Sequence, residues 1–183
     1  RVGDQPNARP VHDYESVQLL KQIAALNRGE DPVAGLLDSG PTNLFTGAAA
    51  DPNSKNFNSL RKRLERKKNS GASFLQTQMV MDPKILERFC KEIADPLELP
   101  TLAGVFLLKS AKNAHFINKV VPGASIPEAI LNRLERAEDP YLEGISIAAE
   151  QIKRFTGIAK GVHIMAIKAE HKIPEILELA KIN

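Results

Sequence analysis

Two glutamines stand in a short segment that otherwise has the composition of a buried β-strand. The segment spans residues 73–79, and Gln76 and Gln78 occupy positions where a core strand usually carries an aliphatic side chain. Because side chains alternate across a strand, both glutamines point to the same face. An unpartnered buried amide costs about 1–3 kcal/mol, so this face either meets a polar ligand or holds an internal hydrogen-bond network. The spacing alone leaves both interpretations open.

A run of cationic side chains is the densest charge feature of the chain. It lies on a predicted helix over residues 58–69 and consists of Arg61, Lys62, Arg63, Arg66, Lys67 and Lys68. Such a run usually forms a solvated helix face. Aromatic residues make up only 5% of the chain and tryptophan is absent, so the run does not indicate a nucleic-acid surface. One or two of these cations are candidates for binding a cofactor phosphate.

Motifs for metal binding and for nucleophilic catalysis are absent from the sequence. The histidines His12, His115, His163 and His171 do not pair at metal-ligand spacing, so we predict no zinc site. His163 falls in a predicted strand and is interpreted as a core histidine with satisfied hydrogen bonds. The single cysteine, Cys90, is interpreted as a small buried hydrophobe. Asp82 is expected to cap a helix, so a catalytic acid is expected outside this chain.

The composition indicates one folded domain over residues 1–183. The chain is 43% hydrophobic and 26% charged, which is enough apolar material for a core, and its net charge of +3 permits an anionic ligand. One cysteine cannot form an internal disulfide, which favours a reducing compartment such as the cytoplasm. No apolar run reaches the ~18 residues that a membrane-spanning helix needs.

Strands are predicted to alternate with helices along the chain. Continuous apolar runs predict strands over 44–49, 73–79, 101–108 and 162–167. Helical periodicity and capping residues predict helices over 14–27, 58–69, 111–119, 127–137, 139–155 and 173–181, and one that starts at Asp82-Pro83. Residues 28–43 are predicted to form a connection. This pattern is typical of an α/β fold with a parallel sheet.

Such a sheet is either a small doubly wound sheet or half of an eight-stranded barrel, and in both the functional residues sit at the carboxyl ends of strands. One such end is Gly-Ala-Ala-Ala at 47–50, which lacks the spacing of a phosphate-binding loop. Its small side chains would let a flat ligand approach closely, and the alternative explanation is tight packing against a helix.

Six segments, in order and at matching spacing, resemble methylenetetrahydrofolate reductases. The most informative is Phe-Leu-Gln-Thr-Gln-Met-Val-Met-Asp-Pro at 74–83, which is similar to the Q-T-Q-x-x-F-D segment of that family. The others are Val-His-Asp-Tyr-Glu-Ser-Val-Gln-Leu-Leu at 11–20, Gly-Ala-Ala-Ala-Asp-Pro-Asn at 47–53, Leu-Ala-Gly-Val-Phe-Leu-Leu-Lys-Ser-Ala-Lys at 102–112, Val-Pro-Gly-Ala-Ser-Ile-Pro at 121–127 and Gly-Val-His-Ile-Met-Ala-Ile at 161–167.

The resemblance implies a (βα)8 TIM barrel that carries FAD, of which this chain would be strands 5–8 with their helices. It implies hydride transfer through the flavin to 5,10-methylenetetrahydrofolate, giving 5-methyltetrahydrofolate for one-carbon and methionine metabolism. The electron donor would be NAD(P)H or a reduced partner protein. The catalytic glutamate of the family lies at the end of the first strand, so the acid would come from the N-terminal half of the barrel.

The resemblance also implies roles for individual residues. Gln78 matches the glutamine that binds the folate pterin, and Gln76 is then interpreted as part of the internal hydrogen-bond network. Cofactor-binding positions of the family fall on His12, Ala48, Ala50 and Lys67, and substrate-binding positions fall on Gln78, Asn113 and Ile117. We predict no metal ligand among them.

Several positions depart from the family pattern. Lys168-Ala169 stand where many members have Asn-Arg, and Ile117 replaces an aromatic residue that stacks on substrate or nicotinamide. Leu60 replaces an acidic flavin contact, and Asn113 replaces a glutamine. The changes at 113, 117 and 169 suggest a divergent branch whose electron donor is a partner protein.

A half-barrel has two exposed sheet edges, which predicts association with the other half or with a second copy as a homo-oligomer. The competing hypothesis is a non-catalytic half-barrel that binds a pterin, a nucleotide or a partner chain.

Overall fold

A parallel sheet of four strands forms the centre of the computed structural model, which describes residues 13–31 and 33–182. The strands run in the order β3 (Gly47–Ala50), β4 (Phe74–Met79), β5 (Thr101–Phe106) and β6 (Gly161–Met165), and each pairs in parallel with the next. The predicted α/β fold with a parallel sheet is therefore confirmed. Among the described residues β3 and β6 are the open edges of this sheet.

Seven α-helices accompany the strands in the described part of the chain. They are α1 (Ser16–Leu26), α2 (Phe57–Asn69), α3 (Pro83–Phe89), α4 (Ala111–Val120), α5 (Glu128–Arg136), α6 (Pro140–Phe155) and α7 (Ile173–Ala180). A π-helical segment, Cys90–Ala94, continues α3, and a 3-10 helix, Glu170–Lys172, precedes α7. The predicted connection over 28–43 contains a small hairpin of β1 (Glu30–Asp31) and β2 (Gly35–Leu36).

Side-chain caps fix where several helices begin. Asp82 accepts a hydrogen bond from the backbone N–H of Lys84, as predicted, and Ser110 caps α4 by accepting from the backbone N–H of Asn113. Asp13, directly before the helix predicted over 14–27, is not its cap. Glu15 is the N-cap, and its backbone N–H donates to Gln18 in a capping box.

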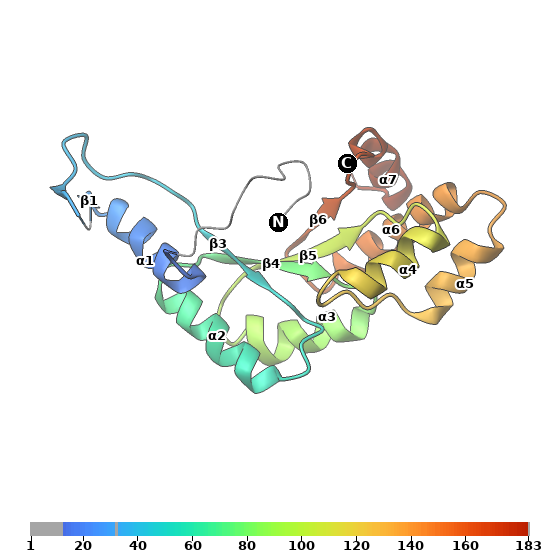
Figure 1. The fold of residues 1–183 in the computed structure, drawn as a ribbon, viewed down its shortest axis with the longest axis horizontal. Coiled ribbons are helices and arrows are strands. Elements are labelled where there is room, and N and C mark those ends of the chain that lie inside the picture. Colours follow the sequence, from blue (N-terminus) through green and yellow to red (C-terminus); the bar gives the residue numbers. More distant parts are fainter. Residues whose placement is uncertain (1–12, 32, 183) are drawn as a thin grey trace.

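One face of the sheet is buried under helices. Leu75, Ala103 and Val105 pack there in a core that also contains buried side chains of α2, α3, α6 and α7. Figure 1 shows α2 and α3 along this side of the sheet. The side chains of β4 alternate as predicted: Leu75, Thr77 and Met79 are buried, whereas Phe74, Gln76 and Gln78 are on the more open face. The open face therefore presents the two glutamines.

An arginine clamp joins α5 to α6. Arg133 Nε donates to Glu143 Oε1 at 2.7 Å, and its two terminal nitrogens donate to both oxygens of Glu150 at 2.8 and 2.9 Å. The hydrogen bonds from Arg133 lower the pKa of Glu150 below its ordinary value of 4.5. A carboxyl group with a lowered folded-state pKa stabilises the fold above its unfolded pKa and loses that contribution as the pH falls through the folded value.

We expect Glu150→Gln to lower the free energy of unfolding by about 0.5–1 kcal/mol at pH 7, because the pair is bidentate but half-exposed. The difference from wild type should shrink as the pH falls well below 4.5. Denaturant unfolding at pH 7 and at acidic pH measures it, with the exposed Glu138→Gln as the control. An unchanged difference at acidic pH would contradict the assigned ion pair.

Candidate functional site

A cavity of about 700 Å³ runs along the edge strand β3, between α2 and the open face of β4, and it reaches the carboxyl ends of both strands. All of β3, the side of α2 that faces the sheet, and residues of β4 and β6 line it. The loop before α5 closes one side with Pro122. The carboxyl ends of parallel strands are where this class of fold places its functional residues, so the cavity is the candidate site.

The β3 wall is built from small residues. Ala48 and Ala50 line the cavity through their backbone, while their side chains are buried on the helix-covered face. Gly47 lies against Phe74, whose ring would overlap any side chain at position 47. The Phe74 ring stacks on Phe45 with centroids 5.2 Å apart. The Phe74 ring covers this wall at Gly47, and beyond it the side chains of β3 are no larger than a methyl group, so a planar ring can approach the backbone there.

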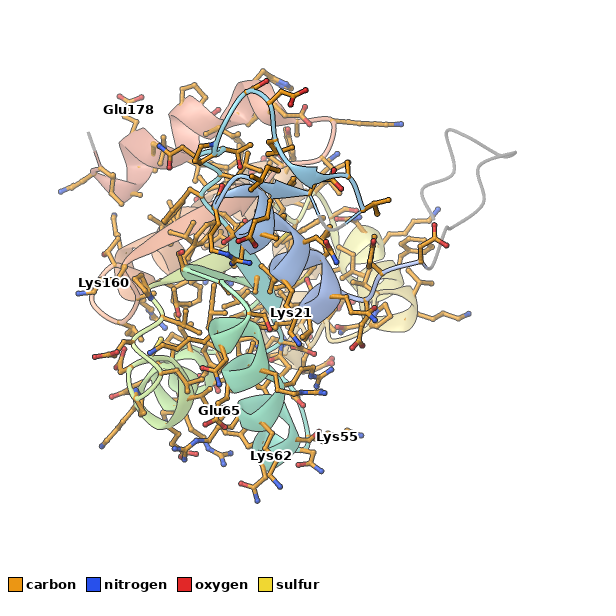
Figure 2. The ribbon with its side chains drawn as sticks, turned by 90° about the vertical axis from the view of Figure 1, so that its left-hand side faces the viewer. Lys21, Lys55, Lys62, Glu65, Lys160 and Glu178 are labelled. Carbon is orange, nitrogen blue, oxygen red and sulfur yellow. The ribbon has the colours of Figure 1, made fainter. Side chains whose placement is uncertain are left out.

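A buried lysine adds positive charge to the same wall. Lys67 on α2 is 8% exposed, and its Nζ donates to the carbonyl oxygen of Ala49 at 2.9 Å. Burial lowers the pKa of Lys67, and the neighbouring charge of Arg63 adds to this effect. Arg63 also lines the cavity, so two cations border it. The outer face of α2 is solvated instead, and Figure 2 shows Lys62 and Glu65 projecting from it.

The amide of Gln78, which also lines the cavity, is held by two hydrogen bonds. Its Nε2 donates to the carbonyl oxygen of Pro122 at 3.1 Å, and its Oε1 accepts from the backbone N–H of Met79 at 2.9 Å. Asn53 ties the same loop to β4, donating to the carbonyl oxygens of Gly123 at 2.8 Å and of Met79 at 3.2 Å. A primary amide has two N–H donors and two acceptor lone pairs, so Gln78 keeps one of each for a ligand.

Gln76 forms an internal hydrogen bond, as the network interpretation predicted. Its Nε2 lies 3.0 Å from His163 Nδ1, and His163 Nε2 lies 2.8 Å from the carbonyl oxygen of Thr77. His163 therefore has its expected partners, but it is only half-buried and lines the cavity instead of lying in the core.

The structure does not bring two of the predicted substrate contacts to the cavity. Ile117 is 3% exposed and packs in an apolar cluster with Met79, Leu108 and Ala114. Asn113 lies in the first turn of α4, where its Oδ1 accepts from the backbone N–H of Lys109. These placements follow from the apolar stripe of α4, which must face the core. His12 lies outside the described residues.

One acidic residue of the site was missed by sequence reasoning. Asp51 lines the cavity directly after β3, and its Oδ1 accepts from the backbone N–H of Asn53 at 3.0 Å. Its position at a strand end is the signal that identifies it in the sequence. Arg63 also lines the cavity, which agrees with the prediction that one or two cations of the basic run are near a ligand, and Phe74 lines it from the same face as Gln76 and Gln78.

Within residues 13–31 and 33–182, no group of three or more histidine, cysteine, aspartate or glutamate side chains is arranged to hold a metal ion. No helix in the same ranges is both long enough and apolar enough to cross a membrane. Cys90 is buried, and burial raises the pKa of its thiol to about 11, which fits the predicted role as a small hydrophobe.

Comparison with known proteins supplies the family. A sequence profile described as methylenetetrahydrofolate reductase matches residues 3–181, which is nearly the whole chain. The chain belongs to the methylenetetrahydrofolate reductase family. The resemblance in the six segments is thereby confirmed. The comparison with curated proteins found no match.

A solved structure with a similar fold is an uncharacterized protein from Clostridium thermocellum that binds two copies of 5-methyl-5,6,7,8-tetrahydrofolic acid. It superposes with a TM-score of 0.54 at 22% sequence identity, over 79% of this chain and 54% of that one. This reductase-family chain therefore spans about half the length of that structure. At this identity the likeness establishes the fold alone.

Proposed function

We propose that this chain contributes one half of the active site of a flavin-dependent methylenetetrahydrofolate reductase, which reduces 5,10-methylenetetrahydrofolate to 5-methyltetrahydrofolate. The observation that carries the proposal is the cavity along β3, which Lys67, β3 and Gln78 line in a chain of this family. The folate bound by the structurally similar protein from Clostridium thermocellum supports the substrate class.

The four strands would be the fifth to eighth strands of a (βα)8 barrel. Helices α2, α3, α6 and α7 contribute to the core on one face of the sheet, and the edges β3 and β6 are open among the described residues. Four further strands would pair with both edges and cover the open face, as barrel closure requires. The first four strands would also supply the catalytic glutamate, and Asp51 is the one carboxylate among the described residues that line this cavity.

The residues of the cavity fit an FAD cofactor. The small residues of Gly47–Ala50 let a flat isoalloxazine ring approach the strand, and Ala48 and Ala50 would border it. Lys67 and Arg63 place two positive charges where a diphosphate can be held. A bound flavin would supply the hydride chemistry that protein side chains lack. The role predicted for His12 stays part of the proposal.

Gln78 would bind the pterin of the folate. Its amide is fixed by Pro122 and Met79, so the free donor and acceptor have a defined direction, and a pterin edge carries the matching amide and amino groups. The electron donor would be a reduced partner protein in preference to NAD(P)H, because Ile117 is buried and offers no ring for nicotinamide stacking. A cytoplasmic location and association into homo-oligomers belong to the same proposal.

Gln78→Ala is expected to weaken binding of 5-methyltetrahydrofolate to the full-length protein about tenfold, because one amide–pterin hydrogen-bond pair is lost. Isothermal titration measures the affinity, and Gln22→Ala on α1, away from the cavity, is the matched control. Equal affinity and turnover in Gln78→Ala and wild type would make Gln78 structural. Folate binding without any turnover in the full-length protein would favour the non-catalytic binding module.

A further inference from the structure

The backbone of β4 contains a bulge beside Gln78. Gln76 pairs with Leu102 of β5, but the next pair is Met79 with Gly104. Three steps along β4 therefore match two steps along β5, so β4 carries one extra residue. Such bulges interrupt the ladder and commonly re-aim side chains next to active sites.

Side chains replace the missing ladder bonds at the bulge. The hydroxyl of Thr77, which is 3% exposed, accepts from the backbone N–H of Gly104 at 2.9 Å. The same hydroxyl donates to the carbonyl oxygen of Gln78 at 2.7 Å. The carbonyl oxygen of Thr77 accepts from His163 Nε2 at 2.8 Å. The bulged backbone is thus held by a hydroxyl and an imidazole.

His163 contacts the carbonyl oxygen of Thr77 from β6, across the intervening strand β5. It lies on β6 and pairs with Gly104 on β5, whereas Thr77 is on β4. Gly104 makes room for the arrangement, because a Cβ at this position would lie 2.8 Å from the carbonyl oxygen of Thr77 and 2.7 Å from that of Gln78. The glycine and the histidine together accommodate the bulge and hold it.

Gln76 fixes the tautomer and the orientation of the His163 imidazole. A carbonyl oxygen only accepts, so His163 Nε2 carries the hydrogen and Nδ1 is the acceptor. The Nε2 amide of Gln76 donates to that acceptor at 3.0 Å. The hydrogen bond that one ring nitrogen of a histidine makes in this way sets the tautomer and the orientation of the ring. The chain of contacts runs from Gln76 through His163 to the backbone that carries Gln78.

We propose that His163 is a positioning residue, which with Gln76 locks the Thr77–Gln78 bulge and so fixes the direction in which the Gln78 amide meets the ligand. The amide is anchored on the backbone N–H of Met79, so a shift of the bulge moves it directly. This inference rests on the ligand-binding role of Gln78 in the proposed function. His163 acts through Gln78 and not by its own contact with the ligand.

Amide hydrogen exchange on the full-length protein tests the locking without any ligand. In His163→Leu the backbone amides of Gly104 and Met79, which donate to Thr77 Oγ1 and to Gln78 Oε1, are expected to exchange about tenfold faster than in wild type. The amide of Leu75, bonded to the carbonyl of Pro100 at the other end of β4, is the internal reference and should not change.

Two further variants keep this test decisive. Gln76→Leu changes an exposed side chain, so it folds even if His163→Leu does not, and it should also speed exchange at Gly104. His115→Leu removes an exposed histidine paired with Glu135 and should leave both amides unchanged. Unchanged exchange at Gly104 and Met79 in both His163→Leu and Gln76→Leu would overturn the proposal.

A double-mutant cycle with 5-methyltetrahydrofolate separates positioning from general destabilisation. His163→Leu should weaken binding about tenfold in wild type, but less than about twofold in the Gln78→Ala background, because its effect passes through Gln78. Equal losses in both backgrounds would overturn the proposal. If the wild-type protein binds no folate, the proposed function fails, and hydrogen exchange still decides the role of His163.

Discussion

Gly144→Ala is expected to lower the free energy of unfolding by about 2–3 kcal/mol, although alanine is the better helix former by about 1 kcal/mol. Gly144 is buried in α6, and a Cβ there would overlap the carbonyl oxygen of Leu108 and lie 2.9 Å from its carbonyl carbon. Neither atom belongs to a flexible side chain, so α6 must move away from the segment that follows β5. Chemical denaturation of the full-length protein measures the loss.

Gly157→Ala is the matched control for this prediction. Gly157 lies just beyond the end of α6, and the nearest atom to an added Cβ is the carbonyl oxygen of Arg154 at 3.9 Å. Its free energy of unfolding should stay within about 0.5 kcal/mol of wild type. A Gly144→Ala protein as stable as the Gly157→Ala protein would mean that α6 does not pack on Leu108 as described.

Lys67→Met is expected to weaken FAD binding by about 10- to 100-fold, because a hydrogen bond to a charged group contributes about 1.5–3 kcal/mol. Methionine has a similar length and keeps the packing of the buried stem, but it cannot neutralise a phosphate. Lys67 is the buried member of the basic run, so after its loss Arg63 is the one cation of the run that still lines the cavity. Quenching of flavin fluorescence gives the affinity.

Lys62→Met provides the control on the same helix. Lys62 projects into solvent from the outer face of α2 (Figure 2) and does not line the cavity, so its replacement should change FAD affinity less than about twofold. Equal affinity losses in the two variants would mean that the overall charge of α2 attracts the flavin. No loss in Lys67→Met would remove Lys67 from the cofactor site.

Much of the fold is local enough to be predicted from the sequence. The four strands are short apolar runs, and Asp82 and Ser110 cap helices through bonds to residues two and three positions away. Alternation along β4 correctly placed Gln76 and Gln78 on one face. The hairpin within residues 28–43 was missed because its strands are only two residues long and have no apolar alternation.

The parts of the site that sequence reasoning could not supply depend on distant residues. The bulge at Gln78 requires Gly104 and His163, which contact Thr77 across 27 and 86 positions of the chain. Ile117 was assigned to the substrate by resemblance, although the helical stripe that it shares with Ala114 already indicated burial. Asp51 lies directly after β3, and only this position at a strand end indicates in the sequence that it belongs to the site.

The optical spectrum of the full-length protein tests the central claim most directly. We predict that the purified protein is yellow, with a flavin band near ~450 nm, or acquires that band when FAD is added. After anaerobic reduction with dithionite, addition of 5,10-methylenetetrahydrofolate should restore the band as 5-methyltetrahydrofolate forms. A colourless full-length protein that takes up no FAD, or a reduced protein that the folate does not reoxidise, would contradict the account.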